Sequence, residues 1–249
     1  MNPATAYFLQ VFLNWSHVIA PAVPVTIVAV RASQARRWSL LWLLSGLFLL
    51  DLACLLSPRL PFMPQGWNWQ GKSLELLWVF AFVATGNAGT IADFGFRWRL
   101  EKGSAVPLLL AVGLALLFPL WGIFAGGFSM PTDVETLLFQ LTLPGIAEEL
   151  VFRGVFQSLL NQVFGRPWKM LGAPVGWGFV ITLVLFTMGH GIFVNSSLRL
   201  QTSLFSMVPA LYLGAVLGWM RERGGSLWPC ILLHNAVNAM FVVGSLLLS

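Results

Sequence analysis

Two adjacent carboxylates within an apolar run are the residues of this chain that point most clearly to chemistry. Glu148 and Glu149 are followed by Arg153, in a stretch whose other residues are typical of a membrane-spanning helix. Charged side chains are costly in such a helix and usually serve a function. Residues four apart share a helix face, so Glu149 can pair with Arg153 while Glu148 faces about 100° away. We therefore expect a neutralised Glu149 and a free, reactive Glu148.

Later apolar runs contain two histidines and an asparagine that could complete a reactive site. His234 and Asn238 are four residues apart and share a helix face, while His190 lies in an earlier run. Glu148 could take a proton from water with the help of His190. His234 and Asn238 could donate hydrogen bonds to an oxyanion, so this set is sufficient for hydrolysis of an amide. The other polar residues in apolar runs are expected to have packing or interface roles: His17, Asp51, Glu75, Asn87 and Asp93.

The same carboxylate and imidazoles could instead hold zinc, because both groups are zinc ligands. The helical H-E-x-x-H spacing is absent, and Asn238 is a poor zinc ligand. Cys54 and Cys230 lie in apolar segments and have neither a disulfide framework nor a zinc-ligand spacing. We therefore expect no metal and no other cofactor, with a zinc-dependent version of the same enzyme as the alternative.

The composition indicates a membrane protein. Of the 249 residues, 57% are hydrophobic and only 9% are charged, whereas soluble domains contain about 25% charged residues. Continuous apolar runs of about 20 residues predict an all-α, polytopic transmembrane helical bundle and exclude a barrel. The net charge of +5 comes from short basic clusters between these runs. Such clusters are topology signals, so we expect no nucleic-acid partner.

About eight spans fit the apolar pattern, at residues 7–30, 38–56, 73–94, 105–128, 132–161, 174–195, 204–220 and 226–248. The fifth span begins with Thr132 and Glu135 in the spacing of a capping box. Counting basic residues in alternate loops assigns Lys72 to a loop and places both termini on the non-cytoplasmic side. We predict a single integral membrane domain, 1–249, with variable N-terminal spans in 1–130 and a motif-bearing catalytic core in 131–249.

Three groups of residues, in this order, resemble the motifs of the CPBP family, which contains CAAX proteases and bacteriocin-processing (Abi) proteins. The groups are E-E-x-x-x-R at Glu148, Glu149 and Arg153, F-x-x-x-H at Phe186 and His190, and H-x-x-x-N at His234 and Asn238. The resemblance covers about residues 143–239. It implies an eight-helix, glutamate-type intramembrane endopeptidase related to the Ras-converting enzyme.

By this resemblance, Glu148 and His190 are catalytic residues that activate water. His234 and Asn238 would form the oxyanion hole. The residues implied to support the site are Glu149, Arg153 and Phe186.

We therefore expect an intramembrane endopeptidase that hydrolyses a peptide bond of a membrane-anchored substrate, either within it or near its C-terminus as in CAAX-type or sorting-type processing. Its partners would be a membrane-anchored peptide or lipidated protein and the lipid bilayer. Its location would be a bacterial inner membrane, or the endoplasmic reticulum membrane in a eukaryote. The alternative from another class is a non-enzymatic immunity or scaffold protein that binds a partner in the same cavity. A transporter is disfavoured, because the few ionisable residues leave no polar path across the bundle.

Overall fold

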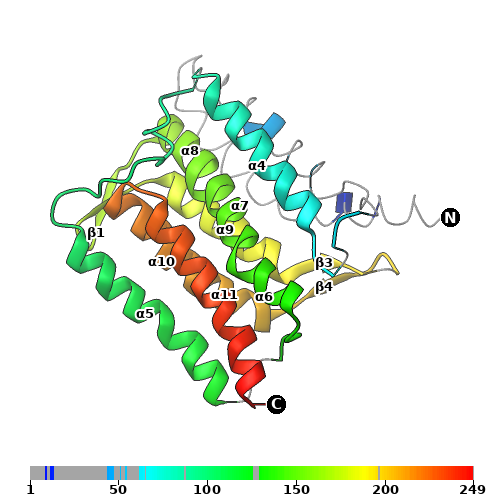
Figure 1. The fold of residues 1–249 in the computed structure, drawn as a ribbon. Coiled ribbons are helices and arrows are strands. Elements are labelled where there is room, and N and C mark those ends of the chain that lie inside the picture. The colour runs from blue at the N-terminus through cyan, green and yellow to red at the C-terminus, as the bar shows by residue number, and fades with distance from the viewer. Residues whose placement is uncertain are drawn as a thin grey trace.

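The structure is a computed structural model that describes residues 9, 12–13, 44–47, 51, 54, 62–64, 66–86, 88–125, 129–195 and 197–248. Most described residues are helical (Figure 1). The helices are α4 (Trp69–Ala84), α5 (Ala105–Phe124), α6 (Val134–Leu141), α7 (Leu143–Glu148), the π-helix η1 (Glu149–Phe156), α8 (Gln157–Phe164), α9 (Trp177–Gly191), α10 (Leu204–Gly224) and α11 (Trp228–Leu248).

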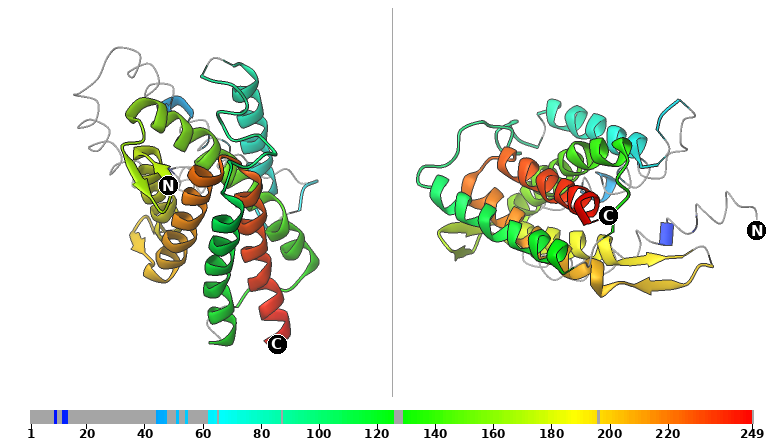
Figure 2. Two further views of the ribbon diagram at one scale, coloured as in Figure 1. Left: turned by 90° about the vertical axis from the view of Figure 1, so that its left-hand side faces the viewer. Right: turned by 60° about the horizontal axis from the view of Figure 1, so that its bottom comes forward.

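Two short antiparallel hairpins depart from the all-α expectation. Strands β1 (Trp168–Met170) and β2 (Ala173–Val175) connect α8 to α9. Strands β3 (Ile192–Val194) and β4 (Leu200–Thr202) connect α9 to α10, and this hairpin extends away from the helices (Figures 1 and 2). The chain is therefore mainly, but not wholly, helical.

Three described helices are long and apolar enough to cross a membrane: α5, α10 and α11. The apolar helix α9 is shorter, at 15 residues. These four helices lie where spans were predicted from residue 105 onward, but the total of about eight spans is not confirmed. The predicted spans at 7–30 and 38–56 lie mostly outside the described residues, and the span predicted at 73–94 contains helix only as far as Ala84.

The helix predicted at 132–161 is four consecutive segments, α6, α7, η1 and α8. Pro144 lies in the first turn of α7 and cannot donate a backbone hydrogen bond, so α6 ends at Leu141 and a new helix begins. The predicted capping box is wrong. Asp133 caps α6 by accepting from the backbone N–H of Thr136 at 2.9 Å. Glu135 instead accepts hydrogen bonds from Trp67 and Trp69, in the segment that leads into α4.

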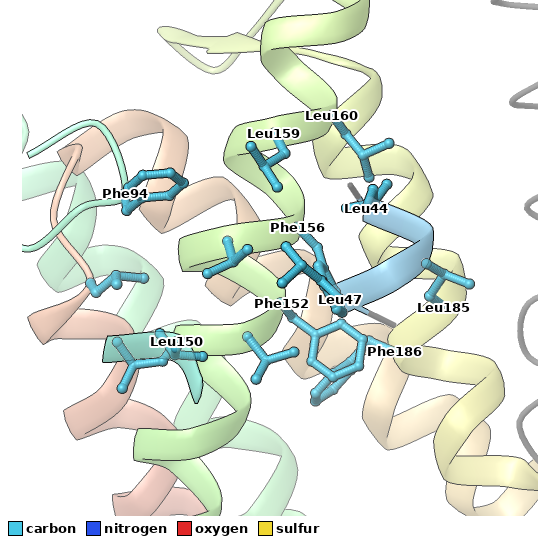
Figure 3. Packing of buried hydrophobic residues seen from close by; sticks show 14 of the residues in the cluster. Leu44, Leu47, Phe94, Leu150, Phe152, Phe156, Leu159, Leu160, Leu185 and Phe186 are labelled. Atoms are coloured by element: carbon cyan, nitrogen blue, oxygen red, sulfur yellow. The ribbon is translucent and has the colours of Figure 1, made fainter. Parts of the chain in front are cut away.

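The segment η1 lies at the centre of a cluster of buried apolar side chains (Figure 3). The rings of Phe152 and Phe156 pack edge to face, and Phe152 packs in the same way on Phe186 of α9. Between membrane helices the hydrophobic drive is weak, so close packing and polar contacts hold the elements together. π-helical segments are rare and are often found at functional sites. Here the π-helix begins at Glu149, directly after Glu148, and its apolar side chains are packed on all sides.

A buried carboxylate joins α8 to α10. Glu222 Oε1 accepts hydrogen bonds from the side-chain amides of Gln157, at 2.8 Å, and Asn161, at 2.6 Å. Its Oε2 pairs with Nε of Arg166 at 2.7 Å. Because each oxygen of Glu222 has a partner, the network fixes α10 against the helix that follows the acidic pair.

Candidate active site

Side chains from three helices converge on Glu148, the last residue of α7. Its Oε2 lies 3.8 Å from Nε2 of His190 and 3.9 Å from Nε2 of His234, which come from α9 and α11. This Oε2 is buried and makes no hydrogen bond with any described residue. Two imidazole nitrogens and a carboxylate oxygen at such separations can share one bridging water molecule. Catalytic roles were predicted for four residues, and the structure brings three of them together: Glu148, His190 and His234.

The other oxygen of Glu148 faces an ammonium group. Nζ of Lys72, on the first turn of α4, lies 3.4 Å from Oε1 of Glu148 and also contacts the carboxylate of Glu75 at 2.9 Å. All three side chains are largely buried. The expectation of an unpartnered Glu148 is therefore wrong, as is the assignment of Lys72 to a connecting loop. Glu75, expected in a packing or interface role, is part of this charged cluster.

The predicted ion pair between Glu149 and Arg153 is present. Nη1 of Arg153 lies 3.1 Å from Oε1 of Glu149, and Nη2 donates to the carbonyl of Gly214 on α10. The same Oε1 accepts a hydrogen bond from Nδ1 of His234 at 2.8 Å. Both charged side chains are fully buried. This pair therefore orients the imidazole whose other nitrogen faces Glu148.

Phe186 connects several of these groups. Its carbonyl oxygen accepts a hydrogen bond from Nδ1 of His190 at 2.8 Å, which leaves Nε2 of that imidazole available toward Glu148. The guanidinium carbon of Arg153 lies 4.1 Å from the centre of the Phe186 ring. A cation in this position is attracted to the face of the ring. The backbone of Phe186 thus orients His190, and its ring contacts Arg153.

Asn238 lies one helical turn beyond His234 on α11. It lines a cavity of about 220 Å³ together with His190 and His234. No described residue hydrogen-bonds to its side-chain amide, so the amide is available to a ligand in this cavity. The structure therefore places the fourth predicted residue in the same cavity as the two histidines.

A close contact sets the position of α11 against the acidic segment. The backbone N–H of Gly145 donates to Oδ1 of Asn235 at 2.9 Å. A Cβ at position 145 would lie about 3.0 Å from the backbone nitrogen of Asn235, and closer still to its side chain. Only glycine allows this approach without a shift of the helices. Asn235 is next to His234, so the contact also fixes where that imidazole lies.

Sequence reasoning missed both Lys72 and the pairing of Gly145 with Asn235. Among the described residues, no group of three or more His, Cys, Asp or Glu side chains is arranged to hold a metal ion. Cys54 and Cys230 are buried and not joined in a disulfide.

The fold and the site define a helical integral membrane protein whose helices gather two carboxylates, two imidazoles and a guanidinium. Residues 130–240 match the model of the family described as type II CAAX prenyl endopeptidase Rce1-like. The chain is also similar to CAAX prenyl protease 2 of Methanococcus maripaludis, at 28% identity over 148 residues. That alignment covers 53% of this chain and 51% of the relative, so the match spans about half of each. No solved structure matches.

This family match and the similarity to the archaeal relative confirm the resemblance stated from the three motifs. The family match contains every residue for which a site role was predicted. Lys72 and α5 lie before it.

Proposed function

We propose that this chain is an intramembrane endopeptidase that hydrolyses a peptide bond near the C-terminus of a prenylated, membrane-anchored protein. The observation that carries the proposal is the convergence of Oε2 of Glu148 with Nε2 of His190 and of His234. The family description and the name of the archaeal relative support a prenylated substrate. The three helices that are long and apolar enough to cross a membrane support the proposal that the substrate is anchored in the bilayer.

In the proposed reaction, a water molecule between Glu148 and His190 attacks the carbonyl carbon of the scissile bond. Glu148 takes the proton of that water, and the carbonyl oxygen becomes an oxyanion. The carbon–nitrogen bond then breaks, and the proton passes to the departing amine. The products are a new C-terminal carboxylate and a free peptide.

The oxyanion would be stabilised by Asn238 and His234. The amide of Asn238 can donate directly, and preorganised donors of this kind typically contribute a factor of about 10²–10³ in kcat. His234 already donates from Nδ1 to Glu149, so donation from Nε2 requires that both ring nitrogens carry hydrogen. Glu149, which accepts the hydrogen bond from Nδ1, and the oxyanion itself would balance the resulting positive charge.

The position of Lys72 is an argument for a mechanism that uses no metal ion. Its ammonium group lies next to Glu148 and balances the charge of the proposed base. A divalent cation bound to Glu148 would be repelled by this ammonium group at short range. We expect chelators to leave the activity unchanged. Loss of activity with a chelator, restored by zinc, would support the zinc-dependent alternative.

The proposal is tested by mass spectrometry of membrane-protein C-termini from cells that express the wild type or Glu148→Gln together with a farnesylated reporter. Shortened termini that end at the prenylated cysteine, found only with the wild type, are expected. Identical termini from the two cultures, with both proteins folded and equally abundant, would contradict the proposal. A biological effect that survives replacement of both Glu148 and His190 would favour the non-enzymatic immunity or scaffold alternative.

A further inference from the structure

The β3–β4 hairpin begins and ends beside the candidate active site. Strand β3 begins two residues after His190, and Phe205 and Ser206, which follow β4, line the same cavity as that histidine. The backbone N–H of Ser203 donates to the carbonyl of Gly191 at 2.7 Å, so the two ends of the hairpin are held together next to His190. From this base the hairpin extends away from the helices (Figure 2). A peptide paired with the hairpin would therefore lead out of the active-site cavity.

The register of the hairpin shows which backbone groups face its free edges. Opposed residues of an antiparallel pair alternate between hydrogen-bonded and non-hydrogen-bonded pairs. The bond at the base of the hairpin is one hydrogen-bonded pair, and the bond of 3.0 Å from the N–H of Asn195 to the carbonyl of Arg199, at the tip, is another. Leu200 and Thr202 belong to the non-hydrogen-bonded pairs of this register. Their N–H and C=O groups therefore point outward, away from β3.

The outer edge of β4 is open to another strand. All three residues of β4 are exposed, and Leu200 has an exposed fraction of 52%. The outward backbone groups of Leu200 and Thr202 make no hydrogen bond with any residue that the structure describes. On β3, by contrast, the N–H of Ile192 already donates to the carbonyl of Met188 in α9. A row of unpaired backbone groups on an exposed strand is a template for the addition of an extended peptide.

The direction of β4 suits a segment that leaves the active site. Strand β4 runs from the tip of the hairpin toward its base at the cavity. A substrate whose scissile bond lies in the cavity continues, toward its C-terminus, from the base to the tip. This segment would be antiparallel to β4 but parallel to β3. Because antiparallel pairing is slightly the more stable of the two, β4 is the better partner.

Arg199 lies where such a segment would end. It comes directly before β4 and is exposed. None of the ion pairs of the described residues involves its guanidinium. In an extended strand, the distance from Thr202 to Arg199 is about 10 Å, which a segment of about three residues would cover. The carboxylate at the end of the segment would then meet a guanidinium, the cation that suits it best in geometry.

We propose that β4 binds the C-terminal segment of the substrate, the part that cleavage releases, as an added antiparallel strand whose carboxylate contacts Arg199. The inference rests on the proposed function and adds how the peptide itself is recognised. Main-chain hydrogen bonds do not depend on the side chains that a peptide carries. The site would therefore select for the distance between the scissile bond and the terminal carboxylate.

The first test measures the contact with the carboxylate. Purified protein in detergent is given a farnesylated peptide with three residues after the modified cysteine, ending in either a free carboxylate or an amide. For the wild type we expect KM to be about fivefold lower with the carboxylate, the size of effect expected for one exposed ion pair. Arg199→Gln should remove this difference by raising KM for the carboxylate form alone. The matched control is Arg99→Gln, which should keep the difference, because Arg99 is exposed in the loop before α5.

The second test measures the strand pairing and needs no substitution in the protein. The same peptide has two backbone amides beyond the scissile bond, and each is N-methylated in turn. In an added strand only one of these amides faces β4, because successive residues alternate in direction. Methylation of that amide should raise KM about tenfold, and methylation of the other much less. Equal effects at the two positions, or equal KM values for the carboxylate and amide peptides, would overturn the inference.

The two proposals fail in different ways. If the wild-type protein leaves all of these peptides intact, the proposed peptidase function is wrong. If it cleaves them but shows no preference for the carboxylate, or no difference between the two methylated positions, the peptidase stands and the binding of the segment at β4 is wrong.

Discussion

Nζ of Lys72 lies 3.4 Å from Oε1 of Glu148, in a contact that joins α4 to the acidic pair at the end of α7. The exposed fractions of the two side chains are 13% and 16%, so water screens this attraction only weakly. Glu75 shares the same ammonium group. Glu148 is therefore held from one side by a cation while its other oxygen faces the two histidines.

Removing this cation should change the pH dependence of the reaction. The charged and titratable groups that face Glu148 are Lys72, Glu75, His190, His234 and Asp51. In Lys72→Gln the carboxylate loses its cation and its protonated, inactive form is favoured. The acid limb of the pH profile of kcat/KM should then move to higher pH by about one unit or more, since one unit corresponds to about 1.4 kcal/mol.

The control for Lys72→Gln is Lys102→Gln, because Lys102 is exposed in the loop before α5. Lys72→Arg keeps the positive charge and should restore most of the wild-type profile. An unchanged acid limb in folded Lys72→Gln would show that this ammonium group does not act on the base.

The buried pair of Glu149 and Arg153 should support both stability and activity. Arg153→Ala leaves a buried carboxylate without its cation, which typically costs about 3–5 kcal/mol of folding free energy. The matched control is Glu101→Ala, because Glu101 is exposed and pairs with Arg97 at the same i, i+4 spacing. Loss of an exposed pair costs about 1 kcal/mol or less. Thermal unfolding in detergent should therefore show a much lower Tm for Arg153→Ala than for Glu101→Ala. Equal Tm values for the two variants would show that the buried pair does not stabilise the fold.

Gly145→Ala should separate α7 from α11. The added methyl group would meet both the backbone and the side chain of Asn235, and such overpacking typically costs about 1–3 kcal/mol. The shift would also move His234 away from Glu148, so kcat should fall. Gly113→Ala is the control, because a Cβ at that helical position meets nothing within 4 Å. Wild-type kcat in Gly145→Ala would show that this contact does not position the histidine.

Much of the site could be predicted from local spacing. The pairing of Glu149 with Arg153 follows from residues four apart, a separation that still brings the two side chains together in the π-helix. The spacing of His234 and Asn238 likewise placed two residues in one cavity. Helices α5, α10 and α11 follow from apolar runs long enough to cross a membrane.

Relations between distant segments could not be predicted in this way. Lys72 is 76 positions before Glu148, and a lysine at the end of an aromatic, proline-rich segment looks like a loop residue. Its contact depends on how α4 packs against α7, which no local pattern contains. Glu135 had the spacing of a capping box, but two tryptophans from the same distant segment compete for its carboxylate. The two short hairpins were missed because three-residue strands give too little alternation to recognise.

The most direct test of the central claim is the rate at which purified protein in vesicles cleaves a farnesylated peptide, measured for wild type, Glu148→Gln and the exposed control Glu101→Gln. If Glu148 is the base that activates water, Glu148→Gln should lose at least about 10²-fold in kcat with an unchanged fold and similar peptide binding. Glu101→Gln should keep the wild-type rate, since its side chain lies in the loop before α5. Turnover by Glu148→Gln at the wild-type rate would contradict the account.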